Sequence, residues 1–144
     1  MPVSKFYTLD LLLYATELLA RRTRASHRLT GFSGAQAQLA MHLEHGAVHA
    51  QDLAQRLQIS KQAVAQLVDA MVAEGTLARH PDPTDRRAKL IRFTNKGQKQ
   101  MRNHRRQLAD IEARLTELAG DKAMTRLRKS LTRILPHLIE ESHP

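Results

Sequence analysis

The sequence predicts a mainly helical fold with one β-hairpin past its midpoint. Apolar residues recur at three- and four-residue spacing over most of the 144 residues, which is typical of amphipathic helices. Between residues 76 and 93 this spacing gives way to alternation around a cluster of proline, aspartate and threonine, typical of two strands joined by a turn. There is no cysteine, and a chain of this length can form a hydrophobic core without disulfides, so we expect a single domain over residues 1–144.

The central helix is expected between Ser60, a good N-cap, and Gly75, which favours a helix end. One face is apolar and is expected to be buried; it consists of Val64, Leu67, Val68, Met71 and Val72. The opposite face is small or polar and consists of Lys61, Gln62, Ala65, Gln66 and Asp69. Because these side chains need no apolar cover, they are free to contact a partner.

A hairpin follows this helix. Its first strand is expected at residues 76–78 and its turn over residues 80–85, where proline and aspartate gather. Beyond the turn, a period of two places Ile91 and Phe93 on one face of a returning strand. The sequence therefore predicts a helix, a hairpin and a second helix in succession.

Two short helices are expected before the central one. The first begins at the cap Ser33 and runs to about residue 45, and the second spans about residues 50–57. Gln58 and Ile59 then form the turn into the central helix. A glycine would adopt the positive φ of such a turn more easily than Gln58 does.

Helices are also expected at both ends of the chain. Residues 6–20 are apolar on more than one side, which implies two partners; one could be the chain's own body and the other a second copy. Thr94 caps a long helix that ends near Gly120, and a last helix begins at Asp121. Pro136 predicts a kink or an early stop in that last helix, because proline lacks the backbone donor.

Positive charge is concentrated in one part of the chain. The formal net charge is +9, and residues 76–107 hold ten Lys or Arg against two acids. A confined basic region with an arginine pair at a hairpin turn is the pattern expected for contact with a phosphate backbone. A solvated basic face stays open as an alternative, above all for Arg102, Arg105 and Arg106. The low aromatic content, 3%, favours duplex over single-stranded nucleic acid.

Two runs carry a family resemblance. ISKQAVAQLVDAMVAEG, residues 59–75, and DPTDRRAKLIRFTNKG, residues 82–97, resemble the recognition helix and the wing of the MarR family of winged helix-turn-helix transcription regulators. The resemblance implies a three-helix core plus a two-stranded β-wing over residues 33–93, with helical dimerisation regions at 4–28 and 95–142. It also implies a homodimer that binds a pseudo-palindromic double-stranded DNA operator and acts as a repressor.

The residues expected to contact the major groove lie at the start of the recognition helix: Ser60, Lys61, Gln62, Ala65 and Gln66. Glutamine can form two hydrogen bonds with adenine, and lysine can reach guanine acceptors or phosphate. In the wing, Arg87 is expected to enter the minor groove while the Asp85 carboxylate braces its guanidinium. Arg79, Arg86 and Lys89 are expected to contact phosphates.

A small-molecule effector is the remaining implication of the resemblance. Such a ligand, often aromatic or phenolic and anionic, would bind between the dimerisation helices and the winged region. Residues that could line this pocket are Phe6, Tyr14, Arg21 and Phe32.

Other functions have weaker support. His42, His45 and His49 lie close together in sequence, but no cysteine or tight carboxylate cluster completes a set of ligands, so we expect neither a metal site nor a cofactor. We find no pattern of catalytic residues and expect no enzyme. A protein-assembly module and a metal-responsive regulator remain the alternatives.

Without a signal peptide or a long apolar run, we expect a cytoplasmic protein with no membrane partner.

Overall fold

A computed structural model describes residues 6–141, apart from the side chains of residues 23–30. The elements follow in the order α1 (Thr8–Thr30), α2 (Gly34–Leu43), β1 (Val48–His49), α3 (Ala50–Leu57), α4 (Lys61–Ala73), β2 (Leu77–Pro81), β3 (Lys89–Phe93), α5 (Asn95–Ala119) and α6 (Asp121–Glu141). The chain groups into two compact units, residues 1–101 and 102–144.

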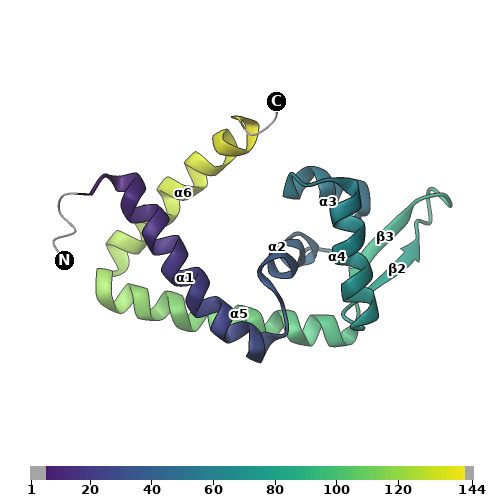
Figure 1. Cartoon of the computed structure of the whole chain (residues 1–144), viewed down its shortest axis with the longest axis horizontal. Helices are drawn as coiled ribbons and strands as arrows, with labels where there is room; N and C mark the ends of the chain where they lie inside the picture. Colours follow the sequence, from purple (N-terminus) through teal and green to yellow (C-terminus); the bar gives the residue numbers. More distant parts are fainter. Residues whose placement is uncertain (1–5, 142–144) are drawn as a thin grey trace. The chain divides into compact units, whose positions relative to one another are not determined.

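The core of the first unit lies between helices α2, α3 and α4 and a small antiparallel sheet of order β1-β3-β2 (Figure 1). Apolar residues from each of these elements, and from the start of α5, are buried there: Phe32, Leu39, Leu43, Val48, Leu53, Val64, Val68, Met71, Leu77, Ile91 and Met101. The predicted buried face of α4 is confirmed, since Val64, Val68 and Met71 are buried and Leu67 and Val72 partly so.

Side-chain caps fix where the helices begin. The Ser33 hydroxyl accepts from the Gln36 N–H, and the Gln36 side chain accepts from the Ser33 N–H, forming a capping box at α2. At α5 the Thr94 hydroxyl accepts from the Gly97 N–H at 3.1 Å and donates to the Gly75 carbonyl at 2.6 Å. The predicted caps at Ser33 and Thr94 are confirmed, and Thr94 also joins α5 to the start of the hairpin.

Gly97 allows α5 to approach the hairpin closely. A Cβ at this position would lie 2.0 Å from the Thr76 carbonyl oxygen and 2.9 Å from the Phe93 ring. Only glycine fits without moving the backbone. The glycine that ends the second run of the family resemblance is therefore required by packing.

The hairpin is longer than the sequence indicated. β2 continues through His80 to Pro81, so the turn predicted to begin at residue 80 begins at Asp82 instead. Proline is tolerated here because β2 is an edge strand, where a missing N–H breaks no ladder on its outer side. The sequence also gave no sign of β1, a two-residue strand in which Val48 pairs with Ile91 and His49 with Leu90.

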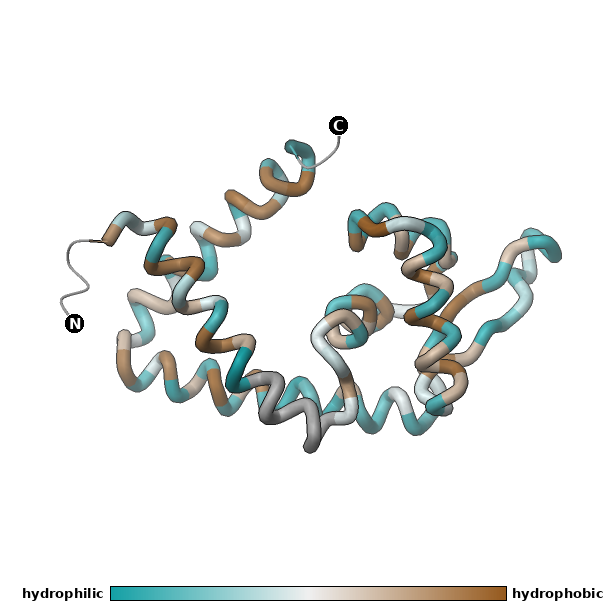
Figure 2. Tube along the Cα trace, viewed as in Figure 1, coloured by the Kyte–Doolittle hydropathy of each residue, from teal (hydrophilic) through white to brown (hydrophobic). Residues whose placement is uncertain are grey.

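The terminal helices present uncovered apolar residues. Leu9, Leu11, Leu12, Leu13 and Leu18 of α1 are exposed, as are Leu127, Ile134, Leu135, Leu138 and Ile139 of α6. Figure 2 shows apolar and polar residues alternating along both helices. Such a large apolar surface needs a partner. Within residues 6–141, no helix is both long and apolar enough to cross a membrane.

The last helix continues through Pro136 to Glu141, so of the two alternatives predicted there, a kink or an early stop, the early stop does not occur. A proline removes one backbone hydrogen bond, but the turns on either side keep theirs and the helix can continue.

Candidate nucleic-acid interface

The α3–α4 turn sets the direction in which α4 leaves the core. Gln58 adopts the left-handed conformation, with φ 55° and ψ 41°, although a glycine would adopt it more easily. The backbone N–H of Gln58 donates hydrogen bonds to carbonyls at the end of α3. Ser60 then caps α4, its hydroxyl accepting from the Ala63 N–H at 3.0 Å. The Ser60 side chain thus has a structural task besides the DNA contact predicted for it.

The polar face of α4 is open to solvent. Lys61, Gln62, Ala65 and Gln66 are all exposed, as expected. Among the described residues, the side chains of Lys61, Gln62 and Gln66 form no hydrogen bond or ion pair that would have to break before they bind a partner. Donors and acceptors on the first two turns of one helix are arranged as a groove-reading helix requires.

Asp82 organises the turn between the strands, a role that the sequence analysis missed. Its Oδ1 accepts from the Thr84 N–H and the Thr84 hydroxyl, both at 2.7 Å, and from the Asp85 N–H at 3.4 Å. Its Oδ2 lies 3.0 Å from Nε2 of His49. Asp82 is only 7% exposed. The hydrogen bonds from Thr84, helped by Asp85 and His49, hold the pKa of the Asp82 carboxyl below its usual range.

Beyond Asp82, the basic residues of the wing face solvent. Arg86, Arg87 and Lys89 are exposed, and within the described residues their side chains form no ion pair. The expected brace takes a different form: Asp85 Oδ1 accepts from the backbone N–H of Arg87 at 2.9 Å, and not from its guanidinium. Asp85 therefore shapes the turn that carries Arg87, while the guanidinium stays unpaired.

Arg79 is the exception among the expected phosphate contacts. Its guanidinium donates to the carboxylate of Asp69, on the polar face of α4. The pair joins β2 to α4, and the Asp69 carboxylate offsets positive charge that Arg79 would otherwise offer to a phosphate. Both side chains are partly exposed, so this pair adds little to stability.

The expected ligand residues are not brought together. Phe6 and Tyr14 line a hollow of about 310 Å³ on α1, with Asp10 and Leu11. Phe32 is fully buried in the core and Arg21 pairs with Glu17 at 2.9 Å, so neither lines this hollow. The Asp10 carboxylate in its wall disfavours an anion there. An aromatic residue between two helices can face a pocket or the core, and Phe32 faces the core in the single chain.

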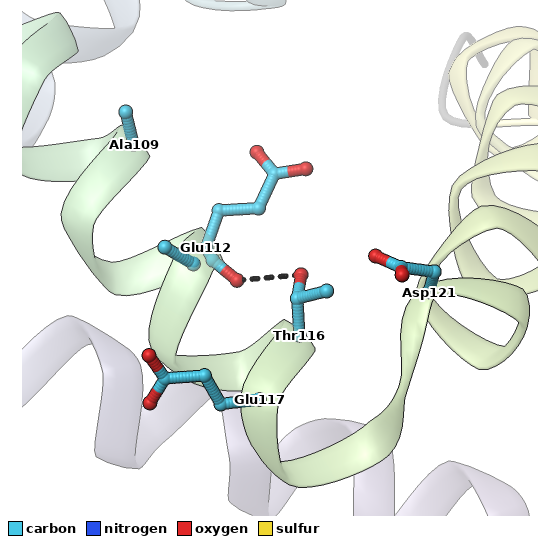
Figure 3. A pocket seen from close by; sticks show the side chains of 6 residues that line it. Ala109, Glu112, Thr116, Glu117 and Asp121 are labelled. Atoms are coloured by element: carbon cyan, nitrogen blue, oxygen red, sulfur yellow. Dashed lines mark hydrogen bonds between the residues drawn. The ribbon is translucent and has the colours of Figure 1, made fainter.

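A second hollow lies at the joint of α5 and α6, where Glu112, Thr116, Glu117 and Asp121 line about 540 Å³ (Figure 3). Its three carboxylates disfavour anions too.

The described residues contain no group of three His, Cys, Asp or Glu side chains placed to hold a metal ion. In the histidine group, the imidazole of His49 faces Asp82. Burial and the nearby Arg56 lower the pKa of His42.

A helix-turn-helix whose second helix has an open polar face, next to a hairpin with exposed arginines at its turn, defines a winged helix-turn-helix fold. Residues 30–88 match a family model described as MarR family. Over this segment the chain is therefore similar to the MarR family of transcription regulators.

Solved structures share the fold over nearly the whole chain. The transcriptional repressor CouR, bound to a 23-mer DNA duplex, has a TM-score of 0.81 at 22% identity, covering 94% of this chain and 98% of its own. The transcriptional regulator SlyA gives 0.80 at 14% identity, covering 95% and 97%. The Staphylococcus aureus MepR–DNA complex gives 0.75 at 19% identity, covering 93% and 99%. No curated protein matches the sequence significantly.

Proposed function

We propose that this chain is a homodimeric repressor that binds a pseudo-palindromic duplex through two copies of the winged unit. In each copy, α4 enters the major groove with Lys61, Gln62, Ala65 and Gln66. Ser60, the N-cap of α4, contacts the DNA at the edge of the same groove. The wing places Arg87 in the adjacent minor groove, while Arg86, Lys89 and Arg79 contact phosphates. Two-fold symmetry then sets the half-sites about 34 Å apart, one turn of the double helix.

The observation that carries this proposal is the combination of two unpaired surfaces on one unit. The polar face of α4 and the Arg86–Arg87 pair are both exposed, and their side chains have no partner among the described residues. Duplex DNA matches both features, since it offers base edges in one groove and a strongly negative potential in the next. The relatives CouR and MepR, solved with DNA, support the same assignment.

The dimer is supported by the uncovered apolar faces of α1 and α6. Burying apolar surface contributes about 25 cal/mol per Å², so two such faces provide ample driving force. We further propose a small-molecule effector, a cytoplasmic location and no enzymatic activity, in keeping with the family.

A titration of random duplex DNA at several salt concentrations tests the proposal. If about eight cations meet phosphates, the logarithm of the association constant should fall with the logarithm of salt concentration with a slope of roughly −7. A weak, salt-independent response would instead favour a protein-assembly module. Affinity that a chelator abolishes would point to a metal-responsive regulator.

A further inference from the structure

The wing loop, residues 82–88, is held mostly by bonds among its own residues. The Asp82 N–H donates to the Ala88 carbonyl at 3.1 Å, and the Ala88 N–H donates to the Asp85 carbonyl at 3.0 Å. With the bonds that Thr84 and Asp85 donate to the Asp82 carboxylate, these fix the shape of the loop. They do not fix its position relative to the helices.

Among the residues that the structure describes, one close polar contact between side chains joins this loop to a residue outside the hairpin. Nε2 of His49 lies 3.0 Å from Oδ2 of Asp82. His49 is held on both sides, because its backbone pairs with Leu90 in the sheet and it directly precedes α3. Its side chain does not cap that helix, so the ring is free to face Asp82.

We propose that His49 is a positioning residue for duplex binding: through Asp82 it holds the wing loop beside the N-terminal end of α3 and so fixes where Arg86 and Arg87 lie. This consequence for DNA rests on the proposed function, whereas the position of the loop can be measured without DNA.

The chemistry of Asp82 explains why the contact matters. The carboxylate is nearly buried, and it uses Oδ1 for the loop and Oδ2 for His49. Without His49, one oxygen of a nearly buried carboxylate has no partner in the described part of the chain, which is unfavourable. The loop relieves this by moving Asp82 toward water. Arg86 and Arg87 move with it, since no ion pair of their own holds them.

His49 lines a hollow at the surface. Three charged side chains line the same hollow: Asp52 of α3, Asp85 of the loop and Lys89 of β3. None of them forms an ion pair with His49, so Asp82 is the group through which the ring acts on the loop.

The first test uses amide hydrogen exchange of the full chain in the absence of DNA. In His49→Ala, the amides of Asp82, Thr84, Asp85 and Ala88 should exchange at least about 5-fold faster, because their hydrogen bonds open more often. His49→Gln should stay close to the parent, since its amide nitrogen can reach the carboxylate and donate to it. Slow amides of α4 should not change, which separates local release from unfolding. The control His45→Ala, at an exposed histidine, should match the parent.

The second test measures affinity for duplex DNA. His49→Ala should bind about 10-fold more weakly than the parent, and His49→Gln should come within about 3-fold of it. In a chain that also carries Arg86→Ala and Arg87→Ala, adding His49→Ala should cost at most about 2-fold, because the residues that it positions are gone.

Three results would overturn the proposal: unchanged exchange in the loop of His49→Ala, no rescue by His49→Gln, or the full 10-fold loss in the chain lacking both arginines. If the parent itself bound no duplex, the proposed function would fail. The exchange experiment would still decide the role of His49.

Discussion

Arg87→Ala should bind specific and random duplexes more weakly by about 10- to 100-fold, as expected for loss of a charged contact of about 1.5–3 kcal/mol. The reason is that the Arg87 guanidinium has no protein partner among the described residues, so its interaction energy is available to DNA. The loss should be largest where the minor groove is narrow, because its potential is most negative there. Fluorescence anisotropy with a narrow-groove and a mixed-sequence duplex measures both effects.

Two comparisons with other variants show whether the loss of affinity is specific to Arg87. Arg126→Ala removes the same charge from an exposed position on α6 and should leave affinity unchanged. Gln62→Ala and Gln66→Ala should instead relax preference at individual bases by about 1–3 kcal/mol. If Arg87→Ala bound both duplexes like the parent, the assignment of Arg87 to the minor groove would be wrong.

Leu12→Asp should convert the dimer into monomers or aggregates. Leu12 lies on α1 and is 40% exposed in a single chain, within the apolar surface that a second copy is proposed to cover. The substitution removes apolar contact and places a carboxylate in a desolvated interface, and the two effects together should weaken dimerisation by about 3 kcal/mol or more. Analytical ultracentrifugation over a range of concentrations measures this, and operator affinity should fall with it.

Gln38→Asp is a suitable control for the charge, because Gln38 is exposed on α2 and is not one of the apolar residues of α1 and α6. It should remain a dimer. A Leu12→Asp protein that stayed a soluble dimer would contradict the interface on α1.

The sequence predicted the recognition helix well because three signals coincide there. Its apolar positions keep helical spacing over the thirteen residues of α4, a serine caps its start and a glycine follows its end. Each signal depends on neighbouring residues alone, and this is the kind of information that a single sequence holds.

What the sequence missed depends on residues far apart in the chain. β1 has two residues, too few for any periodicity, and it exists because Val48 and His49 pair with β3. The Asp-Pro-Thr run could have indicated that Asp82 bonds to its own turn, since aspartate often does so two residues on. Its contact with His49 could not be predicted, because only the folded sheet brings the two together.

The most direct test of the central claim is selection of bound fragments from a random duplex library with the parent protein. An inverted repeat with half-sites centred about 10 base pairs apart is the expected outcome, since two symmetry-related α4 helices would each read one half-site on one face of the duplex. Selected fragments with no shared sequence, or with a single unrepeated half-site, would contradict a symmetric dimer that reads DNA through α4.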